Sequence, residues 1–194
     1  MIAVISSTAV GATQAYFSDT ETSTGNTFAA GTLDLTTDGN NGTNTVKFTI
    51  ANMRPGNQPS GHWTLKNVGS VKGYLDIENV KITGFENGVT EPETEAGDTT
   101  SGVEEGELQN VLGVYLFLDN APVTGWFGAE DVVIYNGLAK NMPSNFELNA
   151  PLNFGAEANV QGIINWWTTA DDNKAQGDSM TLDMTYELGQ TIGQ

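Results

Sequence analysis

The sequence predicts an all-β protein built as a sandwich of two sheets. Its 194 residues include 23 glycines, 6 prolines and many threonines and asparagines, a composition that favours turns over long helices. Short segments of alternating apolar and polar residues recur between these turns, which predicts roughly seven to nine strands. We therefore expect one β-sandwich domain over residues 29–194, long enough to bury a sizeable core, and a separate N-terminal segment at residues 1–28.

The first half of the chain reads as strands separated by glycine-rich or proline-rich turns. A turn at residues 38–42, Asp-Gly-Asn-Asn-Gly, lies between two alternating segments and is typical of a hairpin. The Pro55-Gly56 pair marks the next turn. The strands predicted in this half lie at residues 32–35, 46–50, 62–66 and 73–85.

The second half carries one strongly apolar strand and one predicted hairpin. The run Val111–Leu118 is almost continuously apolar, which indicates a central strand buried on both faces. Around residues 132–135 the pattern fits a short helix or a strand equally well. Residues 162–169 and 180–188 read as a C-terminal hairpin. Strict alternation in its second strand predicts one core-facing row, formed by Met180, Leu182, Met184, Tyr186 and Leu188.

Residues 86–109 differ from the rest of the chain in composition. They combine many acids with Gly, Thr and Pro and have little apolar content, which predicts a solvated acidic loop inserted into the sandwich. The acids of this loop are Glu91, Glu93, Glu95, Asp98, Glu104, Glu105 and Glu107.

The overall charge excludes some classes of partner. The chain has 24 acidic and 7 basic side chains, a net charge of −17, which repels nucleic-acid phosphates and anionic lipid headgroups. Packing such subunits side by side requires screening by salt or by a divalent cation. The chain has no cysteine, so disulfides, thiol catalysis and cysteine-ligated metals are excluded.

The first 15 residues form an uncharged stretch of small and apolar side chains. It ends Ala12-Thr13-Gln14-Ala15, with small residues where a signal peptidase requires them. A complete signal peptide also carries a basic n-region, which residues 1–15 lack. Removal as an export signal and retention in the mature protein both remain open. The stretch is shorter than the about 20 apolar residues that cross a bilayer.

Three segments of the chain carry motifs in a recognisable order. The first runs from Tyr16-Phe17-Ser18-Asp19 to the Thr-Phe-Ala-Ala-Gly-Thr-Leu-Asp-Leu sequence at residues 27–35. The second is Met53-Arg54-Pro55-Gly56, and the third is Gln176-Gly177-Asp178-Ser179 followed by an alternating strand. In order and approximate spacing the chain resembles the TasA/camelysin family of secreted filament subunits, which includes archaeal bundling pilins. Residues 86–150 carry no motif of that family.

This resemblance implies a jelly-roll-like sandwich and a structural role. The expected protein is a non-enzymatic, secreted subunit of an extracellular pilus or biofilm-matrix fibre. Its partner is another copy of itself, with no nucleic acid and no membrane in the assembled form. Polymerisation is expected by donor-strand complementation, in which an N-terminal segment completes the sandwich of the next subunit. The candidate donor residues are Ile2, Val4, Ile5, Ala9, Val10, Tyr16, Phe17 and Phe28.

The sequence gives little support for catalysis. His62 is the sole histidine, whereas a zinc peptidase ordinarily uses two histidines and a carboxylate, typically in a His-Glu-x-x-His motif. A Gly-x-Ser-x-Gly nucleophile elbow is also lacking. We expect His62 to be an ordinary packed or surface residue and the protein not to be an enzyme.

A second reading is a monomeric cell-surface jelly-roll module that binds carbohydrate or calcium. Four tryptophans could stack on sugars, although the adjacent Trp166 and Trp167 must point to opposite sheet faces, so that one is expected in the core. Asn41, in Asn41-Gly42-Thr43, is a weak candidate for glycosylation. No cofactor is required, and calcium is the one candidate ion. Its candidate ligands are Asp38, Asp171, Asp172 and Asp178.

Overall fold

The computed structural model describes residues 30–42, 53–120, 123–167 and 172–193. The chain divides into two compact units, residues 1–30 and residues 31–194. Only Ala30 of the first unit is described, so the account below concerns the second. The strand predicted at residues 46–50 lies outside the described residues.

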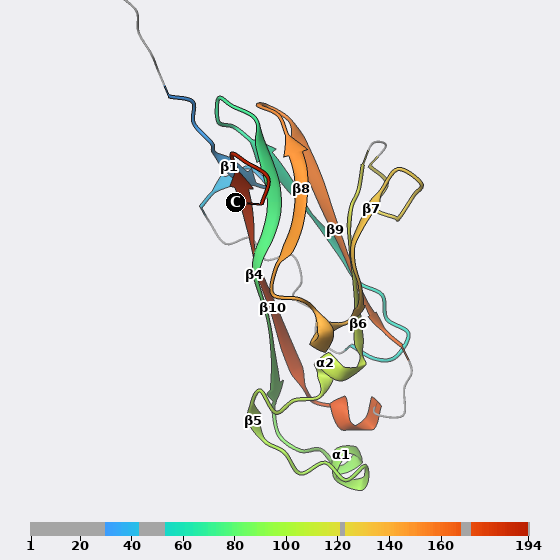
Figure 1. Cartoon of the computed structure of the whole chain (residues 1–194). Helices are drawn as coiled ribbons and strands as arrows, with labels where there is room; N and C mark the ends of the chain where they lie inside the picture. The colour runs from blue at the N-terminus through green and yellow to red at the C-terminus, as the bar shows by residue number, and fades with distance from the viewer. Residues whose placement is uncertain (1–29, 43–52, 121–122, 168–171, 194) are drawn as a thin grey trace, which may run out of the picture. The chain divides into compact units, whose positions relative to one another are not determined.

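The second unit consists mainly of two antiparallel sheets (Figure 1). The larger sheet has the strand order β2-β1-β3-β9-β6-β7, so β2 and β7 are the outermost of its described strands. Its strands are β1 (Leu35–Thr37), β2 (Asn40–Asn41), β3 (Ser60–Asn67), β6 (Leu112–Leu118), β7 (Val132–Leu138) and β9 (Glu157–Trp166).

The smaller sheet is organised around β4, its longest strand. One side of β4 pairs with β10 along nearly its whole length, and the other side pairs with β8 near the start and β5 near the end. The strands are β4 (Gly73–Glu86), β5 (Gly102–Val103), β8 (Phe146–Leu152) and β10 (Ser179–Gly189). The two sheets confirm the predicted all-β sandwich.

Apolar side chains from both sheets meet in one core. Leu65 on β3, Leu75 on β4 and Leu116 on β6 are completely buried, as two-residue alternation on each strand requires. The predicted row on β10 is confirmed for Met180, Leu182, Met184 and Tyr186, which pack against this core, and Leu188 is half-buried. Trp63 and Tyr186 join the sheets through rings 5.9 Å apart.

The predicted C-terminal hairpin is wrong. β9 lies between β3 and β6 in the larger sheet, whereas β10 pairs with β4 in the smaller one. The chain therefore changes sheets between them, through the 3-10 turn η2 (Asp172–Ala175). Alternation of apolar and polar residues predicted both strands. It does not show which strand each one pairs with, and the long polar connection between them allows either sheet. The ambiguous residues 132–135 belong to β7 and are a strand.

The acidic segment contains short regular elements. α1 (Glu91–Glu95) lies beyond one end of β4 and β10 (Figure 1), and β5 pairs with the last two residues of β4. α2 (Leu108–Val111) lies alongside this end of the two strands, and the 3-10 turn η1 (Ala139–Asn141) follows β7. α1 begins with a proline in its first turn and acidic residues that complement the helix dipole. Among the described residues, no helix has the length and apolar character needed to cross a membrane.

Candidate metal centre and strand-acceptor cleft

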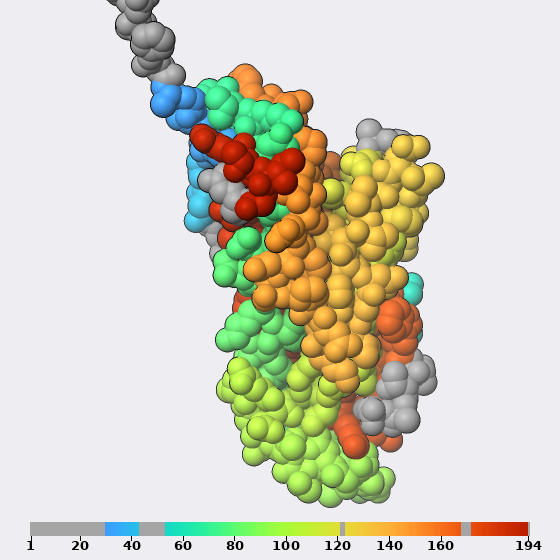
Figure 2. All heavy atoms as spheres, viewed as in Figure 1, coloured from blue at the N-terminus to red at the C-terminus, as the bar shows by residue number. Residues whose placement is uncertain are grey.

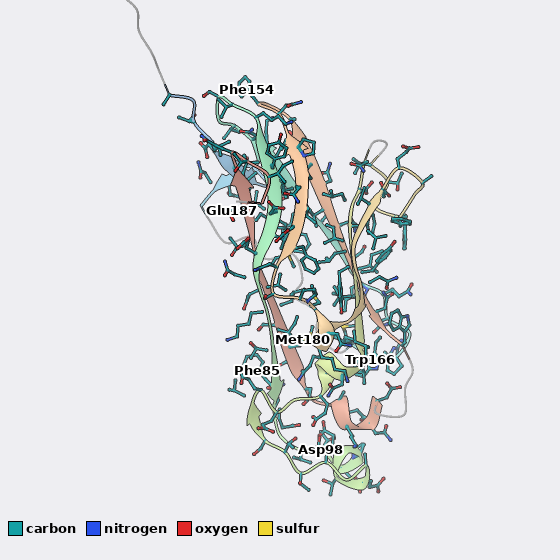
Figure 3. The ribbon with its side chains drawn as sticks, viewed as in Figure 1. Phe85, Asp98, Phe154, Trp166, Met180 and Glu187 are labelled. Carbon is teal, nitrogen blue, oxygen red and sulfur yellow. The ribbon has the colours of Figure 1, made fainter. Side chains whose placement is uncertain are left out.

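Five carboxylates from separate segments converge beyond the end of the smaller sheet. Glu86 ends β4, Glu93 lies in α1, and Asp98 lies in the loop after α1. Glu107 immediately precedes α2 and Asp178 immediately precedes β10. We call these five residues the acidic cluster. Figure 3 shows Asp98 at this end of the unit and Phe154 at the opposite end.

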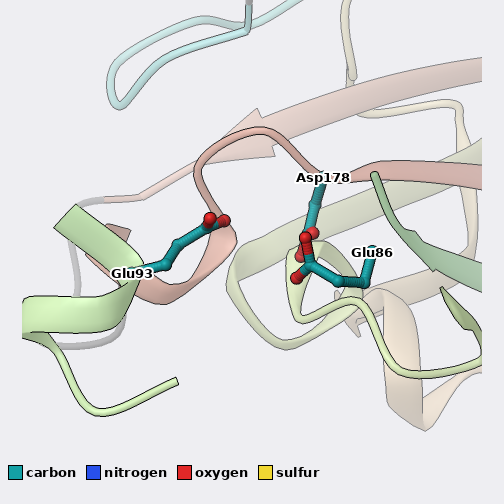
Figure 4. Close-up of side chains that lie close together, drawn as sticks. All are labelled: Glu86, Glu93 and Asp178. Carbon is teal, nitrogen blue, oxygen red and sulfur yellow. The ribbon is translucent and has the colours of Figure 1, made fainter. Parts of the chain in front are cut away.

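The acidic cluster consists of two groups that share Glu86. One group is Glu86, Glu93 and Asp178, and the other is Glu86, Asp98 and Glu107. In each group, one carboxylate oxygen of every residue lies within 4.8 Å of the others. Figure 4 shows the first group, with three side chains reaching from different elements toward one another.

Four of the five carboxylates have one oxygen fixed by a backbone N–H. The Gly88 N–H donates to Glu86 Oε1 at 2.9 Å, and the Thr100 N–H donates to Asp98 Oδ1 at 2.8 Å. Comparable bonds run from the Thr90 N–H to Glu93 Oε2 and from the Glu107 N–H to Asp178 Oδ2. Glu107 Oε1 has only a long contact of 3.4 Å with the Thr100 hydroxyl, which donates to Asp98 Oδ1 at 2.8 Å. These bonds orient the side chains and leave the second oxygen of each one available.

The second oxygen of every carboxylate is buried without a hydrogen-bond partner. These atoms are Glu86 Oε2, Glu93 Oε1, Asp98 Oδ2, Glu107 Oε2 and Asp178 Oδ1. The exposed fractions of Glu86, Glu93 and Asp98 are only 7%, 0% and 5%. Within the described residues, no lysine or arginine forms a salt bridge with any member of the cluster. The expectation that the 86–109 acids are solvated is therefore wrong for Glu93 and Asp98.

Crowding of negative charge shifts the protonation of this cluster. Burial raises the pKa of Glu107 to about 7, and the neighbouring charges of Asp98, Asp178 and Glu86 add to the rise. Burial also raises the pKa of Asp178 to about 7, with Glu86 and Glu93 acting in the same direction and the Glu107 N–H opposing them. The Thr100 N–H lowers the pKa of Asp98. At neutral pH Glu107 and Asp178 are therefore partly protonated, which lowers the negative charge of the cluster.

A second feature is an apolar cleft between edge strands of opposite sheets. β7 pairs only with β6, and β8 pairs only with β4, so each described strand has an unpaired backbone edge. A cleft of about 260 Å³ lies between them. Its lining residues are Leu118, Val132, Val133, Ile134, Phe146, Glu147 and Leu148. In Figure 2 the surface is notched between the yellow segment containing β7 and the orange segment containing β8.

The β7/β8 cleft exposes apolar surface that a monomer leaves in water. Val132 and Val133 are 53% and 46% exposed, and β7 contains no charged residue. Tyr135 and Phe146 connect the two strands by a ring contact at 5.9 Å. By contrast, the exposed face of edge strand β10 includes Asp183 and Glu187, and charges of this kind discourage strand addition.

The structure separates the residues predicted as calcium ligands. Asp178 belongs to the acidic cluster, but Asp38 accepts a bond from the Thr64 N–H at 3.1 Å, and Asp172 accepts one from the Trp166 indole at 2.9 Å. Asp171 lies outside the described residues. The exposed Asn41 donates its side-chain amide to Asp34 at 2.9 Å.

The candidate donor residues all lie outside the described part of the chain. They are Ile2, Val4, Ile5, Ala9, Val10, Tyr16, Phe17 and Phe28.

The expectation for the paired tryptophans is confirmed, since Trp166 is 5% exposed and Trp167 is 47% exposed. His62 is exposed on β3.

Four members of the acidic cluster were not predicted as ligands. Glu86, Glu93, Asp98 and Glu107 follow no metal-binding spacing, and Asp178 is far from them in sequence. One local signal was present, because Thr90-x-x-Glu93 is a capping-box pattern that fixes the Glu93 side chain at the start of α1. It indicates a helix and not a ligand, so the cluster emerges only from the folded chain.

The described unit is an antiparallel β-sandwich with an acidic cluster at one end and an open apolar cleft between two edge strands. The family described as camelysin metallo-endopeptidase matches residues 2–110, more than half of the chain, and the protein belongs to this family. The family is one of secreted proteins and broadly fits a secreted structural subunit. A search of curated proteins gives no match.

The residues present do not fit the catalytic metal that the family description implies. Catalytic zinc sites take histidine together with carboxylate or cysteine ligands. The sole histidine, His62, is exposed on β3 and belongs to neither carboxylate group. The acidic cluster offers only oxygen, which is the donor set of harder cations.

Proposed function

We propose that this protein is the subunit of an extracellular filament of the pilus or biofilm-matrix type. The N-terminal segment of one copy, residues 1–28, completes the sandwich of the next copy by donor-strand complementation. Family membership supports the coarser part of this proposal, a secreted structural protein. The observation that carries the finer part is the apolar cleft between the unpaired edges of β7 and β8.

The cleft has the chemistry that an added strand requires. A segment placed there meets a free backbone edge on each side, and each hydrogen bond formed contributes about 0.5–1.5 kcal/mol net. Side chains docking on Val132, Val133 and Leu148 gain roughly 25 cal/mol for each Å² of apolar surface removed from water. Pro151 lies on β8, and proline is typical of edge strands because it has no backbone N–H to donate to a neighbouring strand.

The N-terminal segment is complementary to this cleft in charge and polarity. Residues 1–15 contain no charged side chain, although the chain as a whole carries a net charge of −17. Glu147 is the one charged residue that lines the cleft. An uncharged donor therefore avoids the repulsion that opposes contact between other surfaces of two copies. If residues 1–15 are removed on export, Tyr16, Phe17 and Phe28 supply the apolar side chains instead.

We further propose that the filament subunit is not a peptidase, despite the description of its family. A single exposed histidine and an oxygen-only acidic cluster support this view. The carbohydrate-binding alternative has weaker support, because Trp166 is buried and the ring of Trp167 lies against Gly113 on β6. An assay of casein hydrolysis with added zinc tests the first point, and cleavage that is lost on His62→Ala would overturn it.

Electron microscopy of the purified protein tests the filament proposal. The full chain is expected to form filaments, and a chain lacking residues 1–28 is expected to remain as soluble, less stable monomers. Discrete particles of the full chain under every salt and calcium condition would contradict the proposal. Normal filaments from the shortened chain would show that the donor strand lies elsewhere.

A further inference from the structure

The acidic cluster buries several carboxylates that no described basic side chain neutralises, which is unfavourable for folding. Five carboxylates from five separate stretches of chain bury one unpartnered oxygen each. Burying an unpaired carboxylate costs several kcal/mol, and the cost rises when several like charges share one site. Folding brings these groups together and fixes their orientation with hydrogen bonds from Gly88, Thr90, Thr100 and Glu107. A bound cation, or protons shared between the carboxyl groups, would reduce this cost.

The geometry of the free oxygens matches one type of cation. Within each group, one carboxylate oxygen of every residue lies within 4.8 Å of those of the other two. Two oxygens that bind one calcium ion at about 2.4 Å are at most about 4.8 Å apart, so the spacing of each pair within a group is compatible with calcium ligation. Calcium accepts irregular sets of carboxylate oxygens, whereas magnesium demands a near-ideal octahedron and zinc prefers nitrogen and sulfur ligands.

We propose that the acidic cluster is a calcium site in which Glu86 is the shared ligand of two adjacent groups. Glu93 and Asp178 complete one group, and Asp98 and Glu107 complete the other. Glu86, Glu93 and Asp98 are almost completely buried. Folding has therefore already removed water from these carboxylates before an ion binds. This site is separate from the β7/β8 cleft and does not depend on filament formation.

Calcium at this position has a structural consequence. The cluster joins the end of β4, the 86–109 segment and the residue before β10. An ion bound there connects the inserted segment to the base of the smaller sheet, as a crosslink would. The main competing explanation is proton sharing, in which pairs of these carboxyls hold protons in place of a metal. Calcium titration at a pH above the pKa of these groups distinguishes the two.

The test uses the full-length protein, freed of metal with a chelator and dialysed to mildly alkaline pH. Isothermal titration with calcium chloride is expected to show saturable binding. At a calcium concentration about 100-fold above the Kd, the Tm is expected to rise by about 5–10 °C. Magnesium at the same concentration is expected to give a much smaller rise. No saturable binding of calcium, or an equal response to magnesium, would overturn the assignment.

Variants that change a single charge locate the site. Glu86→Gln keeps the size of the side chain, and we expect it to weaken calcium binding by more than about tenfold because it removes a ligand from both groups. The matched control is Glu91→Gln, the same change at an exposed residue of α1, which is expected to bind calcium like the unaltered protein. Equal affinities for the two variants would overturn the proposal. Metal-free Glu86→Gln is expected to have a Tm at least equal to that of the metal-free parent, which separates loss of a ligand from misfolding.

Discussion

The β7/β8 cleft and the acidic cluster each lack an interaction partner among the described residues, but of opposite kinds. The cleft leaves apolar side chains such as Val132 and Val133 exposed to water. The cluster instead buries charged side chains such as Glu86 and Glu93 without a counter-charge. Exposed apolar surface costs a folded monomer little, and exposed patches commonly mark interaction sites. Buried unpaired charge acts directly against folding.

This difference predicts which property each region controls. The cleft is expected to govern association between copies, because its apolar surface is satisfied only when another chain covers it. The acidic cluster is expected to govern the stability of each subunit, because its charges are balanced by an ion within the same chain. The predictions below separate these two effects, beginning with the largest.

The largest expected effect is the loss of filaments on placing a charge in the cleft. Val133→Glu puts a carboxylate beside Glu147 where an apolar donor segment is expected to dock, so it opposes docking by desolvation and by repulsion. Electron microscopy is expected to show monomers only. The matched control is Val68→Glu, at a valine that is 40% exposed and outside the cleft, which is expected to polymerise. Filaments of normal length from Val133→Glu would exclude this cleft as the acceptor.

A smaller effect is expected in the free energy of unfolding of the metal-free monomer as the pH changes. The pKa values of Glu107 and Asp178 are raised to about 7 by burial and neighbouring acids, so the folded state binds protons more tightly than the unfolded state. The contribution of these two groups to stability is therefore greatest below the unfolded pKa values of about 4, falls as the pH rises through 7, and is lost above it. Urea unfolding in chelator at several pH values measures this trend. A stability that rises steadily from pH 5 to 8 would contradict the described charge crowding.

The smallest expected effect is the coupling between the two regions. The residues that line the cleft and those of the acidic cluster share no hydrogen bond or ring contact in the described parts of the chain. Changes at Val133 and Glu86 are therefore expected to add in their effects on stability within about 0.3–0.5 kcal/mol. Thermal unfolding of Val133→Glu, Glu86→Gln and the double variant measures the coupling. A larger deviation would show that calcium binding and assembly are linked.

The strands were predictable because local alternation reports burial directly. The row from Met180 to Leu188 and the apolar run before Leu118 both identified core strands, since side chains repeat every two residues. Sheet partners were not predictable in the same way. β9 and β10 are consecutive strands that lie in different sheets, and their alternation is the same whether they pair or not.

The acidic cluster was not predictable from the sequence for a related reason. A segment rich in Glu, Gly and Thr reads as solvated because acids are rarely buried unless they are paired. The local sequence around Glu93 and Asp98 does not show that Glu86 and Asp178 lie beside them, because that proximity depends on how the ends of β4 and β10 come together. Three-dimensional convergence, and not spacing along the chain, defines this site.

The most direct test of the central claim is photo-crosslinking from the cleft. Val133 is replaced by benzoylphenylalanine, and filaments assembled from a mixture of isotopically light and heavy chains are irradiated and analysed by mass spectrometry. The proposed mechanism predicts crosslinks between position 133 of one copy and a peptide within residues 1–28 of another copy, identified by mixed isotope labels. Filaments in which position 133 links only to other parts of the chain, or to no second copy, would contradict it.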